Sequence, residues 1–370
     1  MILDEVDVES RELLARYDFD ADAFDALRAR LMAGELTIGG NVVTGTVEPP
    51  AVEDLTVLPA PGDPSCARAF EVGVDALRRG TVACVVLAGG MATRFGGGVK
   101  GIVEVLDGRS FLDVKLRETR RLAEELDAEI PCALMTSFAT DTAVRAHVRE
   151  RRLGEPRIFS QTAAPRLRPD GSLFVGADGK TSLYGPGHGD VLHSIRSSGT
   201  LDELVAAGVR SVVVSNVDNL GARLDPAIIG MHLLAGRPLT VEVVEKAGDV
   251  GGAPARVDGR PLLLESFRFP SSFDQSRIPV FNTNTALISV EALARPVELT
   301  WLVAEKQVEG ERVLQFERLY HELAAFVPTT FLVVPRHGPR GRFIPVKEPA
   351  DLAAVRPLLR QILAASPLDG

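Results

Sequence analysis

The sequence predicts an α/β fold with a Rossmann-like mixed sheet, mainly parallel, that carries helices on both faces. Apolar runs rich in β-branched residues recur at strand length, and helical stretches such as SFLDVKLRETRRLAEELD and GTLDELVAAG separate them. Strands that alternate with helices are typical of a parallel sheet covered on both sides. The predicted strands lie near residues 81–87, 130–137, 209–216, 238–246 and 329–335.

The remaining elements divide the chain into three parts. Residues 1 to about 35 carry apolar residues at helical spacing, which predicts two amphipathic helices, the first capped by Ser10. Residues 36–66 are rich in Gly, Pro, Val and Thr, which predicts a connector with one short strand, and a helix closed by Gly80 follows. The predicted parts are an N-terminal helical region and connector (1–80), a catalytic α/β domain (81–335) and a short C-terminal segment (336–370).

Composition and charge exclude several classes of protein. With 45% hydrophobic and 25% charged residues, the 370-residue chain has the composition of a folded globular protein. No apolar run approaches the roughly 20 residues of a membrane-spanning helix, and the acidic N-terminus lacks the pattern of a signal peptide. These two features predict a cytoplasmic protein. The net charge of −9 argues against nucleic acid as the main partner.

The three cysteines do not form a recognisable site in the sequence. Cys66, Cys84 and Cys132 are far apart, with no CxxC or Cys/His spacing. Cys84 lies within an apolar run and Cys132 beside another. The sequence therefore predicts buried, small hydrophobic side chains, and neither a disulfide framework nor a zinc site.

A glycine-rich loop directly after the first predicted strand is the main candidate for ligand binding. It reads LAGGMATRFGGGVKG from Leu87 to Gly101. Its glycines let backbone N–H groups approach phosphate oxygens, and Arg94 and Lys100 add two cations. In such sheets, ligands bind beyond the carboxyl ends of the strands. The loop therefore predicts polyphosphate binding, with Leu87, Ala88, Gly89 and Gly90 as nucleotide contacts.

Two familiar phosphate-binding motifs do not explain this loop. The stretch GGGVKG at 96–101 matches GxGxxG, but it begins nine residues after the strand, whereas a dinucleotide fingerprint needs the immediate strand-to-helix turn. A Walker A loop needs GK[ST], and Gly101 follows Lys100.

Further motifs follow the loop in a specific order. They are SQTAAPRL (160–167), YGPGHGDVLHSI (184–195), SNVDNLGA (215–222), VVEK (243–246), LLES (263–266), VFNTNT (280–285), VLQFE (313–317) and VPRHGPRGRFIPVKEPADL (334–352). With AGGxxTR and a lysine six residues later, this order resembles the UTP–glucose-1-phosphate uridylyltransferase (UDP-glucose pyrophosphorylase) family over residues 81–352. The resemblance implies a glycosyltransferase-A-like fold.

The resemblance implies attack of a sugar 1-phosphate oxygen on the α-phosphorus of UTP, with release of pyrophosphate. The attacking oxygen is already an anion, so the site needs positive charge, a metal and alignment but no side-chain nucleophile. Arg94, Lys100, Lys246 and Lys347 would offset the repulsion between the two polyanions. The alternative is that each has no function in the site and is only a solvated charge on a loop or, for Lys246, at the edge of a strand.

The resemblance also implies a metal site and a nucleotide site. Asp218, at the end of a predicted strand, would bind Mg²⁺ through hard oxygen, although an aspartate before asparagine also favours a turn. Gln161 and the glycines Gly187 and Gly189 would recognise the edge of uracil.

The predicted sugar site has six members. Glu265 would accept hydrogen bonds from vicinal hydroxyls, and the asparagines could equally satisfy a local turn. The resemblance implies that His188 lies near the sugar and phosphate as a binding residue, although it could be merely structural. The set consists of His188, Asn219, Glu265, Asn282, Asn284 and Thr285.

The sequence departs from the family at three places. Ala92 stands where related loops commonly carry glycine, so this residue needs another backbone shape or bears strain. Thr285 stands where the family often has asparagine, which leaves the sugar open. The family continues past its VK lysine into a C-terminal β-helix, whereas about twenty residues follow Lys347, so the oligomeric state does not carry over.

The sequence therefore predicts Mg²⁺-dependent, reversible synthesis of a UDP-sugar from UTP and a sugar 1-phosphate, with glucose 1-phosphate favoured. Another sugar 1-phosphate, such as that of N-acetylglucosamine or galactose, is the alternative within this chemistry. A glycosyltransferase that consumes UDP-sugars would need a DxD-like pair instead of NVDN. The last alternative is a non-catalytic UDP-sugar sensor.

Overall fold

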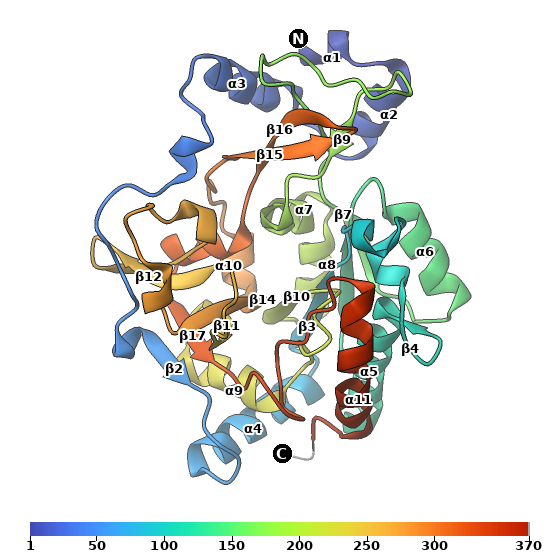
Figure 1. Ribbon diagram of the computed structural model, residues 1–370. Helices are drawn as coiled ribbons and strands as arrows, with labels where there is room; N and C mark the ends of the chain where they lie inside the picture. Colours follow the sequence, from blue (N-terminus) through green and yellow to red (C-terminus); the bar gives the residue numbers. More distant parts are fainter. Residues whose placement is uncertain (369–370) are drawn as a thin grey trace.

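An eight-stranded mixed sheet forms the centre of the molecule in the computed structural model, which describes residues 1–368 (Figure 1). Seven strands are parallel, and β14 runs antiparallel to both of its neighbours, β11 and β10. In spatial order the strands are β2 (Leu55–Val57), β17 (Thr329–Val333), β11 (Leu239–Glu245), β14 (Val280–Ser289), β10 (Ser211–Asn216), β3 (Val82–Leu87), β6 (Cys132–Thr136) and β7 (Arg157–Ser160). The predicted mixed α/β sheet is confirmed.

Helices cover both faces of this sheet because its central strands are apolar on both sides. Along β3, Val82, Cys84 and Val86 join one core, and Ala83, Val85 and Leu87 join the other. The first core includes side chains of α4 (Pro64–Arg78), α5 (Phe111–Leu126), α6 (Asp141–Glu150), α9 (Pro226–Ala235) and α11 (Pro349–Ala364). The second includes those of α7 (Val191–Ser197), α8 (Thr200–Ala206) and α10 (Val290–Ala294).

Helices α4 and α9 pack in direct backbone contact. A Cβ on Gly73 would lie 1.8 Å from the carbonyl oxygen of Pro226, and one on Gly230 would lie 1.7 Å from that of Ala69. Any side chain at either glycine would force the two helices apart.

The N-terminal helices belong to a third core at one end of the molecule (Figure 1). The N-cap of the second helix is Asp7, whose carboxylate accepts from the N–H of Ser10 at 2.9 Å. The prediction of Ser10 as the cap was therefore wrong by three positions; its hydroxyl donates to the carbonyl of Thr181 instead. This core joins α1 (Ile2–Glu5), α2 (Val8–Arg16) and α3 (Ala21–Met32) to β8 (Ala164–Pro165), β9 (Leu183–Tyr184), β15 (Leu302–Val308) and β16 (Glu311–Glu317).

The predicted connector contributes two strands where one was expected. Strand β1 (Val47–Glu48) pairs with β12 (Ala253–Val257), which pairs in turn with β13 (Arg260–Leu264). Strand β2 is an edge strand of the central sheet itself. Another small hairpin joins β4 (Glu104–Leu106) to β5 (Arg109–Ser110). Four short 3-10 helices outside the site are η1 (Gly39–Asn41), η2 (Val52–Asp54), η6 (Ser266–Arg268) and η7 (Gln275–Arg277).

The remaining class predictions concern the membrane and the cysteines. Within residues 1–368, no helix is both long and apolar enough to cross a membrane, and the cytoplasmic location stays a prediction.

All three cysteines are free: Cys66 and Cys84 are buried and Cys132 is partly buried, as expected for small hydrophobic side chains. The fold does bring two of them together, because Cys84 and Cys132 are opposite each other on β3 and β6.

Candidate active site

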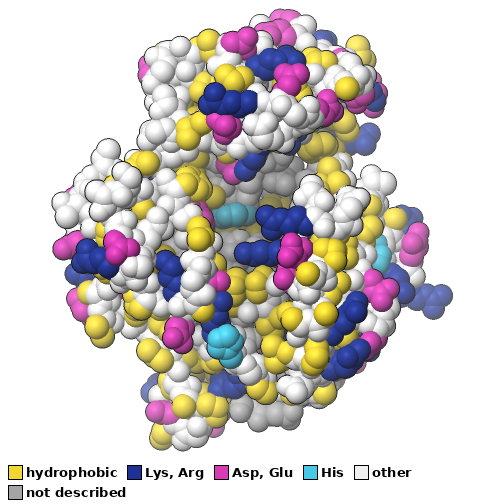
Figure 2. Space-filling view, viewed as in Figure 1, with side chains coloured by type: hydrophobic (Ala, Val, Ile, Leu, Met, Phe, Trp, Pro, Cys, Tyr) yellow, Lys and Arg dark blue, Asp and Glu magenta, His cyan; other side chains and the backbone are white. Residues whose placement is uncertain are grey.

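The predicted motifs converge on one edge of the sheet. Strands β3, β10 and β11 end there, and β14 begins there because it runs antiparallel to them. The chain after β17 returns across this edge, where Val346 donates its backbone N–H to the carbonyl of Asp218 at 3.1 Å. Figure 2 shows a hollow in the centre of the molecule in which Lys, Arg and His side chains gather.

Lys100 and Asp218 meet at this edge, although they are 118 residues apart. The Lys100 Nζ lies 2.5 Å from Asp218 Oδ2, and both side chains are partly buried. The glycine-rich loop makes this contact possible because it folds back on itself: Met91 bridges Val99, and the N–H of Lys100 donates to the carbonyl of Gly90 at 3.1 Å. The structure thus pairs a predicted phosphate ligand with the predicted metal ligand.

Glycines, and not Ala92, adopt the left-handed backbone conformations that turn this loop. Gly96, Gly97 and Gly98 have φ between 81° and 104°, whereas Ala92 has φ −88°. Ala92 therefore takes the alternative backbone shape and bears no left-handed strain.

The other residues of this loop differ in their backbone hydrogen bonds and in their exposure to solvent. Ala88 donates its N–H to Met135 and the carbonyl of Leu87 accepts from Val217, so these two backbone groups belong to the sheet. Gly90 and Arg94 are exposed to solvent. A ligand can therefore reach both of them directly.

Gln161 lies in a slot between two glycines. A Cβ on Gly89 would be 2.7 Å from Gln161 Nε2, and one on Gly185 would be 2.5 Å from Gln161 Cδ. The side chain is 8% exposed, and its Oε1 finds no hydrogen-bond partner within the described chain. A buried amide oxygen without a partner is costly, which marks Gln161 as a group that awaits a ligand.

The two predicted glycines of the GHGD motif allow the backbone of Arg318 to pack closely against them. A Cβ on Gly189 would lie 2.3 Å from the carbonyl carbon of Arg318, and one on Gly187 would lie 3.0 Å from its oxygen. The following Asp190 is buried and accepts from the N–H of Thr162 at 2.6 Å and from the Arg318 guanidinium. The motif therefore joins three segments of the pocket wall, and nucleotide contact by Gly187 and Gly189 stays a prediction.

Asn219 and Thr285 are buried in the framework of the site. Asn219 is 2% exposed; its Nδ2 donates to the carbonyl of Arg342 at 3.1 Å, and its Oδ1 accepts from the N–H of Ile344 at 2.9 Å. Thr285 is buried at the Asn219 amide, with 3.5 Å between Oγ1 and Nδ2. Sugar contact by either side chain stays a prediction, and these bonds instead fasten the C-terminal segment to the end of β10.

The other two members of the NTNT segment lie closer to the opening. Asn284 is left-handed, with φ 57°, and it lies at a β-bulge opposite β11. Its N–H donates to Asn282 Oδ1 at 3.0 Å, and its Nδ2 donates to Asn216 Oδ1 at 2.9 Å. The Oδ1 of Asn284 is buried and, within residues 1–368, has no partner. Asn282 thus satisfies a local turn, and Asn284 keeps one atom for a ligand.

The two remaining predicted lysines, Lys246 and Lys347, differ in their hydrogen bonds. Lys246, after β11, donates from Nζ to the carbonyl of Gln275 at 2.8 Å. Lys347 is exposed, and its backbone N–H donates to Asp351 Oδ2 at 2.7 Å, at the start of α11. The Lys347 ammonium has no hydrogen bond within residues 1–368, so it can move toward a phosphate at once, whereas Lys246 Nζ must first leave the carbonyl of Gln275.

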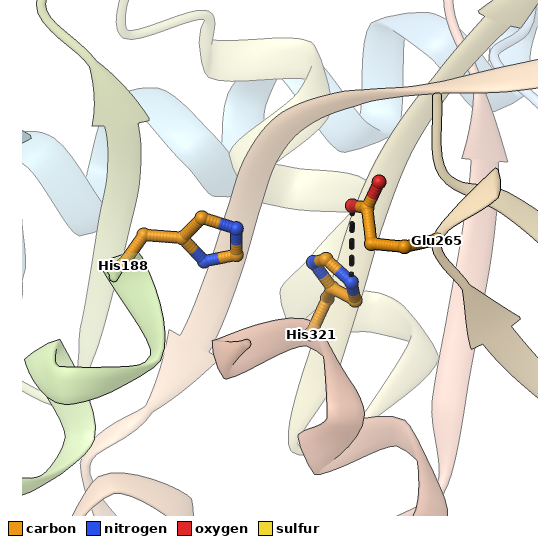
Figure 3. A group of neighbouring side chains, drawn as sticks. All are labelled: His188, Glu265 and His321. Atoms are coloured by element: carbon orange, nitrogen blue, oxygen red, sulfur yellow. Dashed lines mark ion pairs between the residues drawn. The ribbon is translucent and has the colours of Figure 1, made fainter. Parts of the chain in front are cut away.

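His188 and Glu265 face a third residue, His321 (Figure 3). His188 lies on η5 (His188–Asp190), His321 lies on η8 (Tyr320–Ala325), and Glu265 follows β13. The His321 Nε2 is 3.3 Å from Glu265 Oε1. Burial raises the pKa of Glu265 to about 6, lowers that of His188 to about 4, and holds that of His321 well below its usual range. Both imidazoles are therefore neutral at pH 7.

Sequence reasoning missed three buried groups beside the site. His321 is four residues beyond the VLQFE motif, and a lone histidine on a helical turn gives no signal. Lys115, within α5, donates to the carbonyl of Ala222 at 2.6 Å, and burial lowers its pKa to about 8. Arg342 pairs with Glu242 through two contacts of 2.9 and 2.7 Å. Its place in the RFIPVK motif was the one available hint.

Comparisons with known proteins identify the family. The family model for UTP–glucose-1-phosphate uridylyltransferase matches residues 72–363. A relative of that name from Astragalus penduliflorus is 34% identical over 289 residues, which cover 73% of this chain and 60% of the relative. The Saccharomyces cerevisiae relative is 33% identical over 297 residues, which cover 74% and 59%. The chain thus spans about 60% of the length of these curated relatives.

Solved structures give the same result. The UDP-glucose phosphorylase of Trypanosoma brucei superposes with a TM-score of 0.74 at 26% identity, over 90% of this chain and 74% of that one. A Leishmania major UDP-glucose pyrophosphorylase mutant in complex with UDP-glucose gives 0.69 at 26% identity, over 88% and 73%. The match to the family model and the order of the site motifs lead to one conclusion: the chain belongs to the UTP–glucose-1-phosphate uridylyltransferase family.

Proposed function

We propose that the protein transfers a uridylyl group reversibly from UTP to a sugar 1-phosphate, with glucose 1-phosphate favoured, and releases pyrophosphate. The observation that carries this proposal is the Lys100–Asp218 pair at the carboxyl edge of β3 and β10. A cation and a carboxylate held together at this edge suit a magnesium triphosphate, because the first binds phosphate oxygens and the second can bind the metal. Such a pair is of no use to a protein that only carries a neutral sugar.

The chain's own residues would bind and align two anions. Lys100 and Arg94 flank the glycine-rich loop, and Lys347 lies on the segment that returns across the same edge. These cations reduce the repulsion between the sugar phosphate and the triphosphate and stabilise the charge that develops on the departing pyrophosphate. The attacking phosphate oxygen needs no general base, so alignment contributes the rest of the acceleration.

The residues present fit a bound Mg²⁺ ion. Asp218 offers a hard oxygen at the mouth of the site, and its contact with Lys100 uses Oδ2, which leaves Oδ1 for a metal. Mg²⁺ is commonly held by one or two carboxylates, phosphate oxygens and water. When bound, the ion would neutralise phosphate charge and fix the orientation of the triphosphate.

The uracil and sugar ends of the site are distinct. The unpartnered Oε1 of Gln161 can accept from the N–H of uracil, and its slot between Gly89 and Gly185 leaves little freedom. Glu265 and Asn284 would contact the sugar. Relatives named for glucose 1-phosphate, and a neighbour bound to UDP-glucose, support glucose as the sugar.

The test is pyrophosphate release with Mg²⁺ and UTP across a panel of sugar 1-phosphates, with ATP, GTP, CTP and dTTP as controls. We expect release with UTP and glucose 1-phosphate, and dependence on added Mg²⁺. Protein that binds UTP but releases no pyrophosphate with any sugar would contradict the proposal.

A further inference from the structure

Two buried histidines of this protein differ in their hydrogen bonding. His232 is 3% exposed and has partners at both nitrogens, Thr240 Oγ1 at 2.9 Å and Ser211 Oγ at 3.3 Å. His321 is 1% exposed, and neither of its nitrogens has a hydrogen-bond partner in the part of the chain that the structure describes. The Nε2 of His321 lies 3.3 Å from Glu265 Oε1, but the contact lacks the geometry of a hydrogen bond. A buried imidazole without hydrogen bonds is costly, so a ligand that hydrogen-bonds to His321 would remove this cost.

The spacing around His321 indicates the size of that partner. One ligand atom each from His188, Glu265 and His321 lie within 4.8 Å of one another (Figure 3). Some point therefore lies no more than about 2.8 Å from all three atoms, and this is the length of a hydrogen bond to a hydroxyl. A zinc ion needs shorter contacts of about 2.0 to 2.2 Å, so a zinc-binding measurement distinguishes the two ligands.

The chemistry of the three groups also matches a hydroxyl. The carboxylate of Glu265 only accepts hydrogen bonds, and it can take the hydroxyl proton. The Nδ1 of His188 accepts from the N–H of Tyr320 at 3.4 Å, which places the ring proton on Nε2 as a donor. His321 supplies another ring N–H. A hydroxyl donates once and accepts twice, so one hydroxyl can bond one carboxylate oxygen and one nitrogen of each imidazole.

We propose that His321 is a specificity-determining residue that, together with His188 and Glu265, binds one hydroxyl of the sugar 1-phosphate. This inference rests on the proposed function and adds to it a residue of the sugar site. The subsite would recognise the sugar by a single bridging hydroxyl, and a sugar that lacks this hydroxyl would leave His321 buried and unpartnered again.

The first experiment is steady-state kinetics of His321→Phe, which keeps a ring of similar size and removes both nitrogens. We expect KM for the sugar 1-phosphate to rise about 10- to 100-fold, with a smaller change in kcat and none in KM for UTP. His321→Gln, which keeps hydrogen-bonding atoms, should recover part of the loss. The matched control is His193→Phe, because His193 is exposed and pairs with Asp18. An unchanged sugar KM in His321→Phe would overturn the proposal.

The second experiment identifies the hydroxyl with monodeoxy sugar 1-phosphates. With the wild-type protein, one deoxy sugar should raise KM by about the same factor as His321→Phe does with the complete sugar. With His321→Phe, the same deoxy sugar should raise KM little further. If the effects of the mutation and of the missing hydroxyl on KM multiply for every deoxy sugar, the proposal is overturned.

A third measurement separates this inference from the proposed reaction. Calorimetry with UDP and UDP-glucose gives the affinity that the sugar adds. If the wild-type protein releases no pyrophosphate but binds UDP-glucose more tightly than UDP, and His321→Phe loses that increment, the subsite stands and the reaction fails. If the increment is absent in the wild-type protein, the inference fails. Stoichiometric Zn²⁺ binding that His321→Phe and Glu265→Gln abolish would also overturn it, in favour of a metal site.

Discussion

Two groups of buried polar residues lie at the same edge of the sheet and differ in one respect. The framework group, Asn219, Glu242 and Arg342, pairs its side-chain oxygens and nitrogens with one another or with nearby backbone. The open group, Gln161, Asn284 and His321, keeps buried atoms that have no partner among residues 1–368.

For these six residues, we expect this difference to predict structural and binding roles better than residue type does. Asn219 and Asn284 are both asparagines in site motifs, yet the first holds the chain after β17 and the second keeps a free oxygen. Buried polar atoms are normally satisfied, so the satisfied group serves the fold and the unsatisfied one awaits a substrate. The framework group should therefore respond to mutation in stability, and the open group in activity.

The largest expected effect is on stability, in Glu242→Gln. Glu242 and Arg342 are both buried and form a bidentate pair. Removal of one charge leaves an uncompensated guanidinium, which should lower the free energy of unfolding by about 3 to 5 kcal/mol. Urea denaturation measures the change. The control, Glu305→Gln, breaks the exposed pair with Arg312 and should lose less than about 1 kcal/mol. Equal losses in the two variants would contradict the framework role.

Lys100→Ala should have the largest effect on activity. Its ammonium is partly buried beside Asp218, and its loss should lower kcat more than about a hundredfold if the charge stabilises the departing pyrophosphate. Pyrophosphate release at saturating substrates measures this. Lys180→Ala, which removes an exposed partner of Glu9, should have near-normal turnover. Near-normal turnover in Lys100→Ala would remove Lys100 from the catalytic residues.

Gln161→Leu tests the open group at the nucleotide end. Leucine has a similar shape but no amide, so KM for UTP should rise about tenfold while the unfolding free energy stays near that of the wild-type protein. A drop in stability with an unchanged KM would assign Gln161 to the framework group instead.

The smallest effect is a pH dependence from Glu265. Burial raises its pKa to about 6, so an ionised carboxylate is available to the sugar above pH 6 and is lost below it. We expect kcat/KM for the sugar 1-phosphate to fall below pH 6, and Glu265→Gln to lack this limb. The folded state binds this proton more tightly than the unfolded state, whose carboxyl has its ordinary pKa near 4.5. Wild-type stability should therefore rise relative to Glu265→Gln as pH falls from 6 to 4.5; the opposite slope would contradict this assignment.

The sequence predicted the sheet and the place of the site well because both depend on local patterns. The apolar runs became β3, β6, β10, β11 and β17, and the loop after β3 lies where a strand end places it. The antiparallel β14 could not be read in the same way, because VFNTNT resembles a binding motif more than a strand. Two partners of Asn219, Arg342 and Ile344, lie more than 120 residues away in the sequence. Nothing near His321 in the sequence indicates that it lies beside Glu265 and His188. Such contacts depend on tertiary packing, which no local pattern encodes.

The bonds of Asn219 to the chain near Ile344 also bear on how the protein is made. The amide that closes this corner is synthesised 125 residues before the N–H that satisfies it. While the chain emerges from the ribosome, the sheet can pair β3 with β10, but the corner after β10 stays open to water until residues 342–346 arrive. The pocket is therefore completed late in synthesis, and a nascent chain that stalls before this segment would expose the corner to solvent and to chaperones.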